Sequence, residues 1–247
     1  MIQLLNTARK GGSVMTIRWD EITLDNLSAL EKVFEIYDRT FPIEVCESHN
    51  IFEKSLQYAK NERFNNYRFL VGFEGEKLVS FATGHYFADV NSGFIVYIVT
   101  NPMLRSKGVG TQTLLKLEEL LNEDALLAGN PSLKALFLET ETKDMVHTEE
   151  EKENCIKRDR FFSMNDFKRF QKIDYLQPPL HLGENNVPLN LYIKSIQTSE
   201  ITEAEIVEVI RVIFKEKYYL VNGIQKDILY RCLEEMGLKR QEVVFKE

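Results

Sequence analysis

The stretch TNPMLRSKGVGTQTLLKLEELL, residues 100–121, joins an apolar run to a helical pattern through a turn that holds two cations and two glycines. The first N–H groups of a helix have no partner within the helix, and the helix dipole places partial positive charge beside them. Glycine lets the backbone approach a phosphate closely, and Arg105 and Lys107 add full positive charges. The turn therefore predicts a site for a phosphate-containing ligand, and a pyrophosphate fits it well.

The spacing of the glycines indicates which phosphate ligand to expect. It matches neither the dinucleotide pattern GxGxxG nor the nucleoside-triphosphate pattern GxxxxGK[ST]. Pro102, Arg105, Gly108 and Gly110 resemble the acetyl-CoA signature of the GNAT N-acetyltransferases, in which a strand precedes Pro-x-x-Arg-x-x-Gly-x-Gly and a helix follows it. The resemblance implies an acyltransferase that uses acetyl-CoA (CoA) as co-substrate and needs no metal.

The composition of the 247-residue chain excludes several classes of protein. A formal charge of -7 disfavours nucleic-acid binding, which relies on lysine and arginine against phosphate. No run approaches the roughly 18 apolar residues of a membrane span, so no membrane partner is expected. Cys46, Cys155 and Cys232 are widely spaced, which is typical of reduced thiols in a cytoplasmic protein.

Periodicity and turn signals predict the order of elements. A strand precedes two amphipathic helices, a hairpin and an apolar strand that leads into the turn. After the helix of the opening stretch come an interior strand, a charged helix and two final strands. The predicted ranges are 16–22, 27–37, 49–61, 67–75, 76–87, 93–100, 133–142, 149–162, 167–177 and 189–196. This order resembles that of the GNAT family, which implies an α/β (α+β) fold with a mixed central sheet of about seven strands flanked by helices.

The ends of the chain fall outside this resemblance. Residues 1–14 are interpreted as a loose leader, and Met15 could be the true start. Residues 15–196 then form the acetyltransferase domain, and residues 197–247 form a helical appendage. Thr202 and Glu205 predict a capping box at the start of its first helix, and Gly237 predicts the end of its second. The apolar stripes of both helices need a surface to cover them, either the main sheet or a second subunit, so a homodimer remains open.

The resemblance also assigns the residues that hold the cofactor. In the family the pantetheine arm lies against the central strand like an additional strand, and the pyrophosphate lies on the turn. The cofactor-binding residues implied are Ile98, Val99 and Thr100 in the strand, and Arg105, Ser106, Lys107, Gly108, Val109, Gly110 and Thr111 in the turn and the helix start.

Glu139 and Glu141 are the candidate catalytic residues. They alternate with Leu138 and Thr140 at the end of an interior strand, so both carboxylates point to one face. Carboxylates that share a face raise each other's pKa, which suits a general base near neutral pH. We rank Glu139 first because it lies deeper in the strand. His85 is the first alternative among the histidines, and His147 follows it.

One position departs from the family pattern. The family's usual general acid is a tyrosine, but Phe162 stands at that position and has no proton to donate. Tyr175, Tyr97, His85 or water could replace it. The sequence therefore predicts an acetyl-CoA-dependent N-acetyltransferase that acts on a primary amine of a small molecule or peptide by direct attack in a ternary complex. The alternative is a non-catalytic acyl-CoA-binding module whose C-terminal helices engage a partner.

Overall fold

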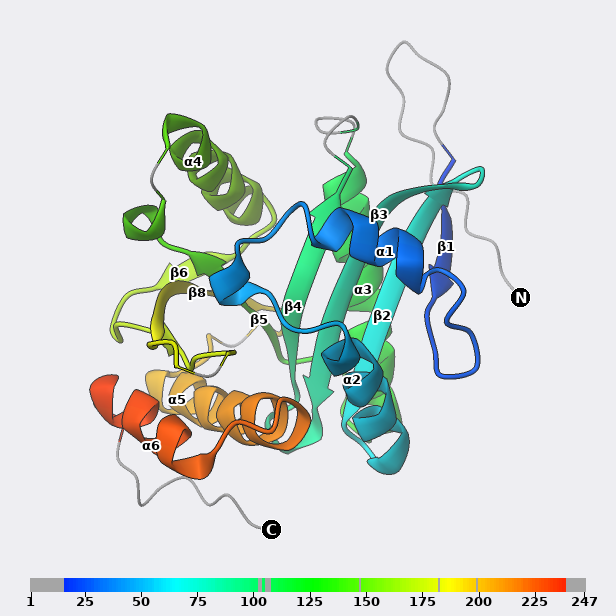
Figure 1. The fold of residues 1–247 in the computed structure, drawn as a ribbon. Coiled ribbons are helices and arrows are strands. Elements are labelled where there is room, and N and C mark those ends of the chain that lie inside the picture. The colour runs from blue at the N-terminus through cyan, green and yellow to red at the C-terminus, as the bar shows by residue number, and fades with distance from the viewer. Residues whose placement is uncertain are drawn as a thin grey trace.

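The fold is described from a computed structural model, which covers residues 16–238 apart from 102–103, 105–107, 147, 182 and 199. Figure 1 shows a central sheet with helices packed around it. The strands are β1 (Arg18–Glu21), β2 (Asn66–Glu74), β3 (Lys77–Phe87), β4 (Ser92–Thr100), β5 (Ala135–Glu141), β6 (Lys168–Phe170), β7 (Leu176–Gln177) and β8 (Val187–Ser195).

The helices were predicted from sequence at the same places in the chain. They are α1 (Leu30–Tyr37), α2 (Asn50–Asn61), α3 (Val109–Leu127), α4 (Glu149–Met164), α5 (Glu203–Val212), the π-helix η5 (Ile213–Val221) and α6 (Lys226–Glu235). Short 3₁₀ turns include η1 (Ile43–Val45), η2 (Ala88–Val90) and η4 (Lys143–Met145). The π-helix is a difference from the prediction, because the apolar stripe indicated one regular α-helix from residue 202 onward.

The described strands form one mixed sheet of eight strands in the order β1-β2-β3-β4-β5-β8-β6, with β7 paired to β8. This confirms the predicted fold class, and the strand beyond the expected seven is the two-residue β7. β4 and β5 are parallel, whereas the other paired strands are antiparallel. Gly75 makes the predicted hairpin turn between β2 and β3 with a left-handed φ of 58°.

The two central strands separate along their length. The pairing of β4 with β5 ends at Ile95 and Leu138, although β4 runs on to Thr100 and β5 to Glu141. β3 accompanies β4 to its end, and β8 accompanies β5 to Glu141. The inner edges of β4 beyond Ile95 and of β5 beyond Leu138 therefore diverge from each other. An extended ligand could bond to the backbone there.

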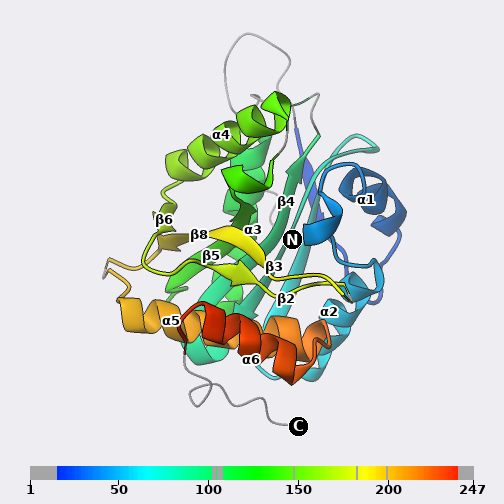
Figure 2. The same cartoon turned by 60° about the vertical axis from the view of Figure 1, so that its left-hand side comes forward.

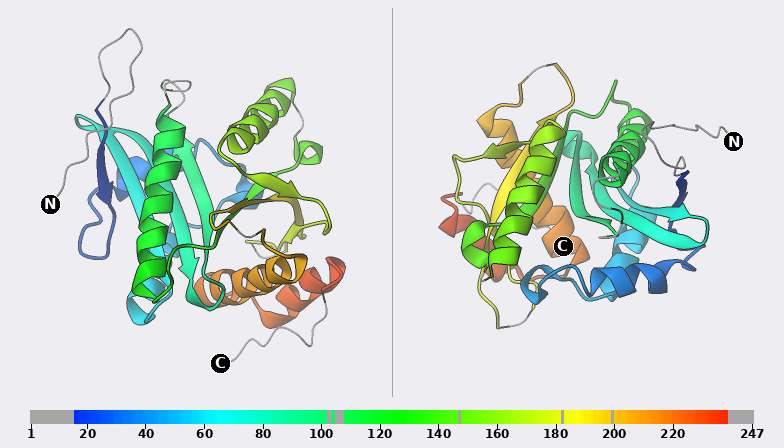
Figure 3. Two further views of the ribbon diagram at one scale, coloured as in Figure 1. Left: turned by 180° about the vertical axis from the view of Figure 1, so that it is seen from behind. Right: turned by 90° about the horizontal axis from the view of Figure 1, so that it is seen from above.

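Helices cover both faces of the sheet. The apolar side chains of α1 and α2 pack on β2, β3 and β4, and those of α3 pack on the opposite face together with Phe162 of α4. Figure 3 shows α3 and the pair α1–α2 on opposite sides of the sheet. α5, η5 and α6 cover β5 and β8. Phe41 and Val96 contact both this cluster and that of α1 and α2, so these helices share one face.

The C-terminal helices pack on the sheet of their own chain. Their predicted stripe residues, among them Ile206, Ile210 and Phe214, are buried in the same cluster as Phe137 of β5 and Leu191 of β8. Figure 2 shows α5 and α6 lying across the lower end of the sheet beside α2. The sequence left open whether the main sheet or a second subunit covers the apolar stripes of these helices. In the structure the sheet of the same chain covers them.

Capping residues explain where α4, α5 and α6 begin or end, and those of α5 and α6 were predicted from the sequence. Thr202 and Glu205 form the expected capping box at the start of α5, and Thr148 and Glu151 form another at the start of α4. Gly237 follows α6 with a left-handed φ of 77°. In the part of the chain that the structure describes, no helix is long and apolar enough to cross a membrane.

Candidate active site

A pocket opens where β4 and β5 diverge. Its ionisable lining residues come from four segments: Glu139 and Glu141 on β5, Tyr97 on β4, Glu47 before α2, and Lys217 and Tyr218 on η5. We call it the reaction pocket. Its remaining lining residues are Phe41, Val45, Val96, Thr140, Gln177, Leu180 and Leu189. The two predicted carboxylates therefore do face one pocket, as their spacing in the strand indicated.

Glu139 is held by two tyrosine hydroxyls. Tyr218 donates from η5 at 3.0 Å to Oε1 and 2.8 Å to Oε2, and Tyr175 donates to Oε1 from the residue before β7. Burial raises the pKa of the Glu139 carboxyl to about 7, while the tyrosine hydroxyls and Lys217 act in the opposite direction. A carboxyl with this pKa exchanges its proton near neutral pH, which is the property a general base needs.

Both tyrosines act as donors to Glu139. Burial raises the pKa of Tyr175 and of Tyr218 well above the ordinary value, and the nearby Glu139 raises it further. The two hydroxyls therefore keep their protons at neutral pH. They fix the orientation of the carboxyl group and leave a lone pair of Oε2 for a further proton.

Glu141 has a different environment at the end of the same strand. Arg158 of α4 contacts Glu141 Oε2 through Nη1 at 2.8 Å, and its Nη2 lies 3.4 Å from the Glu141 carbonyl oxygen. The guanidinium occupies Oε2 of Glu141 in a close ion pair. The two predicted carboxylates therefore differ in their partners: tyrosine hydroxyls hold Glu139, and a guanidinium holds Glu141.

A buried ion pair forms the wall of the pocket opposite β5. Lys217 is 1% exposed, and its Nζ lies 2.5 Å from Oε1 of Glu47, which is 7% exposed. Asn222, just after η5, donates its Nδ2 to the same oxygen at 2.5 Å. Removing one partner of such a pair leaves a buried charge uncompensated, which typically costs about 3–5 kcal/mol. The pair therefore fixes η5 against the segment before α2.

Tyr97 joins this wall to the central sheet. Its hydroxyl donates to the carbonyl oxygen of Val45 at 2.9 Å and accepts from the Tyr37 hydroxyl at 3.0 Å. The backbone N–H of Glu47 donates to the Tyr37 hydroxyl at 2.6 Å. Burial raises the pKa of Tyr97 well above its ordinary value, so the hydroxyl on the pocket wall is protonated.

The cofactor end of the site is partly described. Arg105, Ser106 and Lys107 lie outside the described residues. Gly108 precedes α3 with a left-handed φ of 77°, a conformation that glycine adopts without strain. Val109 is buried, so its side chain anchors the helix start.

Gly110 has a second reason to lack a side chain. A Cβ on it would lie 3.2 Å from the ring of Phe161 and 3.4 Å from Oγ1 of Thr100. The sequence argument gave both glycines the role of making room for phosphate. At Gly110 the described neighbours are Thr100 at the end of β4 and Phe161 of α4. The missing side chain therefore also lets α3 start close to both elements.

The two phenylalanines of α4 point to different places. Phe162, at the position where the family has a tyrosine, is buried in the core against Phe167 and Tyr192. Phe161 is the ring that lies beside Gly110 and Thr100. Neither ring has a hydroxyl, so neither side chain can donate a proton.

His85 is placed away from the pocket. It is 0% exposed, stacks on Phe87 and lies against Tyr67, and neither ring nitrogen has a hydrogen-bond partner among the described residues. Burial, with a smaller contribution from Lys217, holds the pKa of His85 well below its ordinary value. His147 lies outside the described residues. Across the described ranges, no cluster of histidine, cysteine and acidic side chains is arranged to hold a metal.

Among the ionisable residues of this pocket, the sequence analysis missed Glu47, Lys217 and Tyr218. A signal for two of them was present. The stripe through Ile210, Ile213 and Phe214 continues, at spacings of three and four residues, to Lys217 and Tyr218. A lysine on an apolar stripe indicates a buried charge that needs a partner. Nothing in the local sequence pointed to Glu47 as that partner.

Comparisons with known proteins agree with this geometry. Residues 30–140 match the acetyltransferase (GNAT) family. No curated protein sequence matches the chain. Among solved structures, a protein from Bacteroides thetaiotaomicron assigned to the GNAT acetyltransferases is similar with a TM-score of 0.60 and 22% identity, covering 84% of this chain and 99% of its own.

Two further structures are similar at lower identity. One is an acetyltransferase of the GNAT family from Staphylococcus aureus Mu50, with a TM-score of 0.51 and 14% identity over 73% of this chain and 99% of its own. The other is Ard1 from Thermoplasma volcanium, with a TM-score of 0.50 and 13% identity over 73% of this chain and 98% of its own. At identities this low, the two similarities show only that the fold is shared.

The order of the sheet, the divergence of β4 from β5 and the family match define the class of protein. The chain matches the acetyltransferase (GNAT) family over residues 30–140. It is thus an acyltransferase, which confirms the class of enzyme predicted from the sequence.

Proposed function

We propose that the protein transfers an acetyl group from acetyl-CoA to a primary amine of a small molecule or peptide, with Glu139 as general base. The observation that carries the proposal is the position of Glu139, on the wall of a pocket at the point where β4 and β5 diverge. Its pKa of about 7 and its two tyrosine donors support the role of a base. Glu141, which Arg158 holds, is the second candidate.

The reaction follows from this arrangement by a direct attack. The ammonium group of the acceptor gives a proton to Oε2 of Glu139, directly or through a water molecule, and becomes a nucleophilic amine. The amine nitrogen attacks the thioester carbonyl carbon and forms a C–N bond. The C–S bond then breaks and CoA leaves as a thiolate, while the nitrogen gives up its second proton, which the thiolate takes up to form the thiol. A free thiol has a pKa of about 8.5, so the thiolate leaves without a strong acid.

Acetyl-CoA would lie in the gap between the two strands. The backbone of Ile98, Val99 and Thr100 faces this gap beyond the last β4–β5 pair, which supports the arm of the cofactor in the manner of an additional strand. The start of α3, from Gly108 to Thr111, offers N–H groups without helical partners for the pyrophosphate. Arg105, Ser106 and Lys107 complete the proposed site. No metal is required.

The non-catalytic alternative rests on the missing tyrosine hydroxyl at Phe162. Free CoA release, measured from acetyl-CoA with a panel of primary amines, separates the two functions. The proposed function predicts release that depends on the amine. Binding of acetyl-CoA without release for any amine would support the binding module instead.

The proposed cofactor site makes the two glycines sensitive to substitution. Replacing Gly108 and Gly110 with valine is expected to abolish acetyl-CoA binding, measured by calorimetry. Valine is strained at the left-handed φ of Gly108, and at Gly110 its side chain would press on Phe161 and Thr100. A Gly129→Val variant is the control, because Gly129 also has a left-handed φ and follows α3 at its far end. Unchanged binding in the double variant would contradict the pyrophosphate site.

Tyr218→Phe tests the environment of Glu139. The change removes a hydroxyl that stabilises the charged carboxylate, so the pKa of Glu139 should rise and less of it should be deprotonated at pH 7. Turnover at pH 7 is expected to fall about tenfold, the scale of one hydrogen bond to a charged group. The rising limb of the pH–rate profile should move to higher pH.

Tyr219→Phe is the matched control for this prediction. Tyr219 is the next residue on η5 and does not line the reaction pocket, and its ring lies under Lys226. Its pH–rate profile should match that of the unchanged protein. A Tyr218→Phe variant with lower turnover but an unmoved profile would show that Tyr218 only supports the fold.

A further inference from the structure

One face of α4 spans the open end of the gap between β4 and β5. Arg158 on this helix pairs with Glu141, the last residue of β5, and its Nη1 lies 2.8 Å from Oε2. Three residues later, the ring of Phe161 borders Gly110, and so does the side chain of Thr100, the last residue of β4. Residues three apart share a face of a helix, so this face reaches from the end of one strand to the end of the other.

The backbone of β5 shows on which side of the strand the guanidinium lies. The N–H of Ile196 donates to the carbonyl oxygen of Lys134 at 2.9 Å, just before the first listed β5–β8 pair. In an antiparallel pair, hydrogen-bonded positions recur at every second residue, so the even-numbered residues of β5 bond to β8. The carbonyl oxygen of Glu141 therefore points to the side of β4. Nη2 of Arg158 lies 3.4 Å from this oxygen, which places the guanidinium at the gap.

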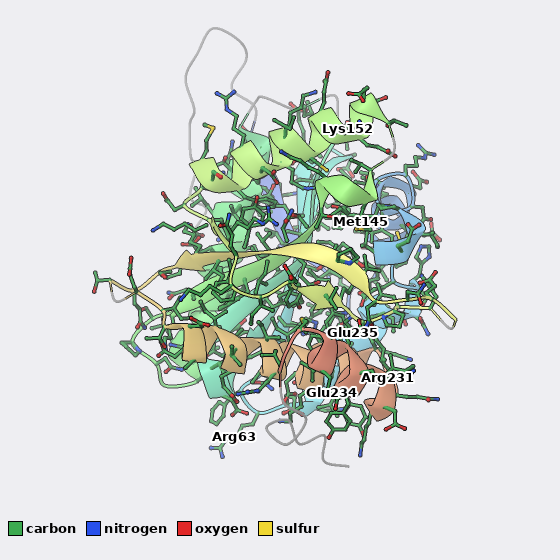
Figure 4. All side chains as sticks on the ribbon, turned by 90° about the vertical axis from the view of Figure 1, so that its left-hand side faces the viewer. Arg63, Met145, Lys152, Arg231, Glu234 and Glu235 are labelled. Carbon is green, nitrogen blue, oxygen red and sulfur yellow. The ribbon has the colours of Figure 1, made fainter. Side chains whose placement is uncertain are left out.

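The pair of Arg158 and Glu141 joins the two faces of the sheet. Phe162 shows that α4 packs on the face that α3 covers, whereas the reaction pocket lies on the opposite face. Figure 4 shows α4, with Lys152 labelled on it, running across the upper end of the sheet. The side chain of Arg158 is 29% exposed and that of Glu141 is 14% exposed, so the pair is not sealed in the core.

The reaction pocket has an excess of carboxylates. Glu47, Glu139 and Glu141 line it, and the lysine of its lining, Lys217, is already paired with Glu47 at 2.5 Å. A thiolate that forms in the gap adds a further negative charge close to β5, where like charges repel it. Arg158 is the cation that the structure places in contact with this end of β5.

The guanidinium has donors left for another acceptor. Besides its contacts with Glu141, Nη2 donates to Sγ of Cys155 at 3.2 Å. A guanidinium carries five N–H groups, so these contacts do not exhaust it. The other charged groups that act on Cys155 are Glu141, Asp159 and Lys143. Lys143 is exposed and Asp159 already accepts from a tyrosine hydroxyl, so neither takes over the place of Arg158.

We propose that the guanidinium of Arg158 stabilises the CoA thiolate as the C–S bond breaks. The electron pair of that bond passes to the sulfur, the guanidinium keeps its protons, and the proton that the sulfur finally takes is the second proton of the nitrogen. The inference rests on the proposed function, because it needs the arm of acetyl-CoA in the gap. Arg158 is then a catalytic residue that supplies positive charge at a site where Phe162 has no hydroxyl to offer.

The ionisation of bound CoA tests this role without acetyl transfer. The complex with CoA is titrated over pH, and the thiolate is followed by its ultraviolet absorbance, with the desulfo-CoA complex as the blank for the protein's own cysteines and tyrosines. Arg158→Met should raise the pKa of the bound thiol by about one unit or more, the shift that a nearby opposite charge produces. With a saturating amine, kcat should fall by up to about tenfold, the equivalent of one unit.

Further variants separate the charge of Arg158 from its packing. Arg158→Gln should show the same shift as Arg158→Met, and Glu141→Gln, which removes a negative charge from the same place, should move the pKa of the bound thiol in the opposite direction. Arg160→Met is the matched control, because Arg160 is exposed on the same helix, and it should leave the pKa of the thiol unchanged.

Two results would overturn the role of Arg158. One is an unmoved pKa of the thiol in both neutral variants with CoA still bound. The other is an equal loss of CoA and desulfo-CoA binding in both variants, which would make Arg158 a residue that holds the arm of the cofactor and not its sulfur.

Amine acetylation separates this inference from the proposed function. A thiol pKa that depends on Arg158, with no acetylation of any amine, would keep Arg158 at the sulfur and refute the transferase. Amine-dependent CoA release with a thiol pKa that is the same in the unchanged protein and in Arg158→Met would support the transferase and refute the role of Arg158.

Discussion

Replacing Glu139 with glutamine should lower turnover at pH 7 about 10²–10⁴-fold, the usual contribution of a positioned general base. The amide keeps the shape of the side chain and cannot accept a proton from the acceptor. Acetyl-CoA affinity should barely change, because Glu139 faces the pocket wall formed by η5 and lies away from the start of α3. The measurement is kcat from CoA release, together with the Kd of acetyl-CoA from calorimetry.

The pH dependence gives this prediction a second readout. A group with a pKa of about 7 is increasingly deprotonated as the pH rises through that value, so turnover of the unchanged protein should rise over the same range. The defect of Glu139→Gln should shrink at higher pH, since more of the acceptor amine is then already deprotonated in solution. A defect that is constant across the pH range would contradict the role of Glu139 as base.

Glu141→Gln is the matched control on the same strand. Its carboxylate is already held by Arg158, so its loss should have the smaller effect on turnover. The reverse ranking would assign the base to Glu141. Full activity in both variants and in the double variant would show that neither carboxylate takes the proton.

Ending the chain at Ile196 should prevent the protein from folding to its native state. More than half of the buried residues in the cluster on β5 and β8 come from α5, η5 and the segment that follows. Each large apolar side chain contributes about 1.5–3 kcal/mol on burial, whereas a whole domain is stable by about 5–15 kcal/mol. The shortened chain should be less soluble, associate, or melt without a cooperative transition.

A variant that ends at Leu238 is the control, because it keeps every described member of this cluster. Light scattering and thermal melting compare the three proteins. The same mass and the same Tm in the chain that ends at Ile196 would refute the structural role of the C-terminal helices.

Much of the fold could be predicted from the sequence because its signals are local. The glycine turn, the apolar run of β4 and the helical stripes each indicate one element from nearby residues alone. The placing of Glu139 and Glu141 on one pocket also followed from the alternation of side chains along a strand. The two-residue β7 and the π-helical winding of η5 have no such local pattern, because tertiary contacts decide them.

The wall of the pocket formed by Glu47 and Lys217 could not be predicted, because it depends on a contact between distant segments. Glu47 and Lys217 lie 170 positions apart in the chain, and nothing in either segment indicates the other. Phe161 and Phe162 are neighbours in sequence, and only the packing of α4 decides that Phe162 enters the core while Phe161 lies beside Gly110. Contacts between distant segments are the part of this site that one sequence does not reveal.

Three consecutive residues of η5 hold three separate parts of the protein. Glu216 accepts from Tyr58 of α2 at 2.5 Å, Lys217 pairs with Glu47, and Tyr218 donates to Glu139. A single inserted or deleted residue upstream of this triplet would turn all three side chains away from their partners at once. Any attempt to transplant this acetyltransferase into a fusion or a chimera has to carry η5 with it in unchanged register. A cut at residue 140, where the family match ends, would remove Glu141, Lys217 and Tyr218 from the reaction pocket.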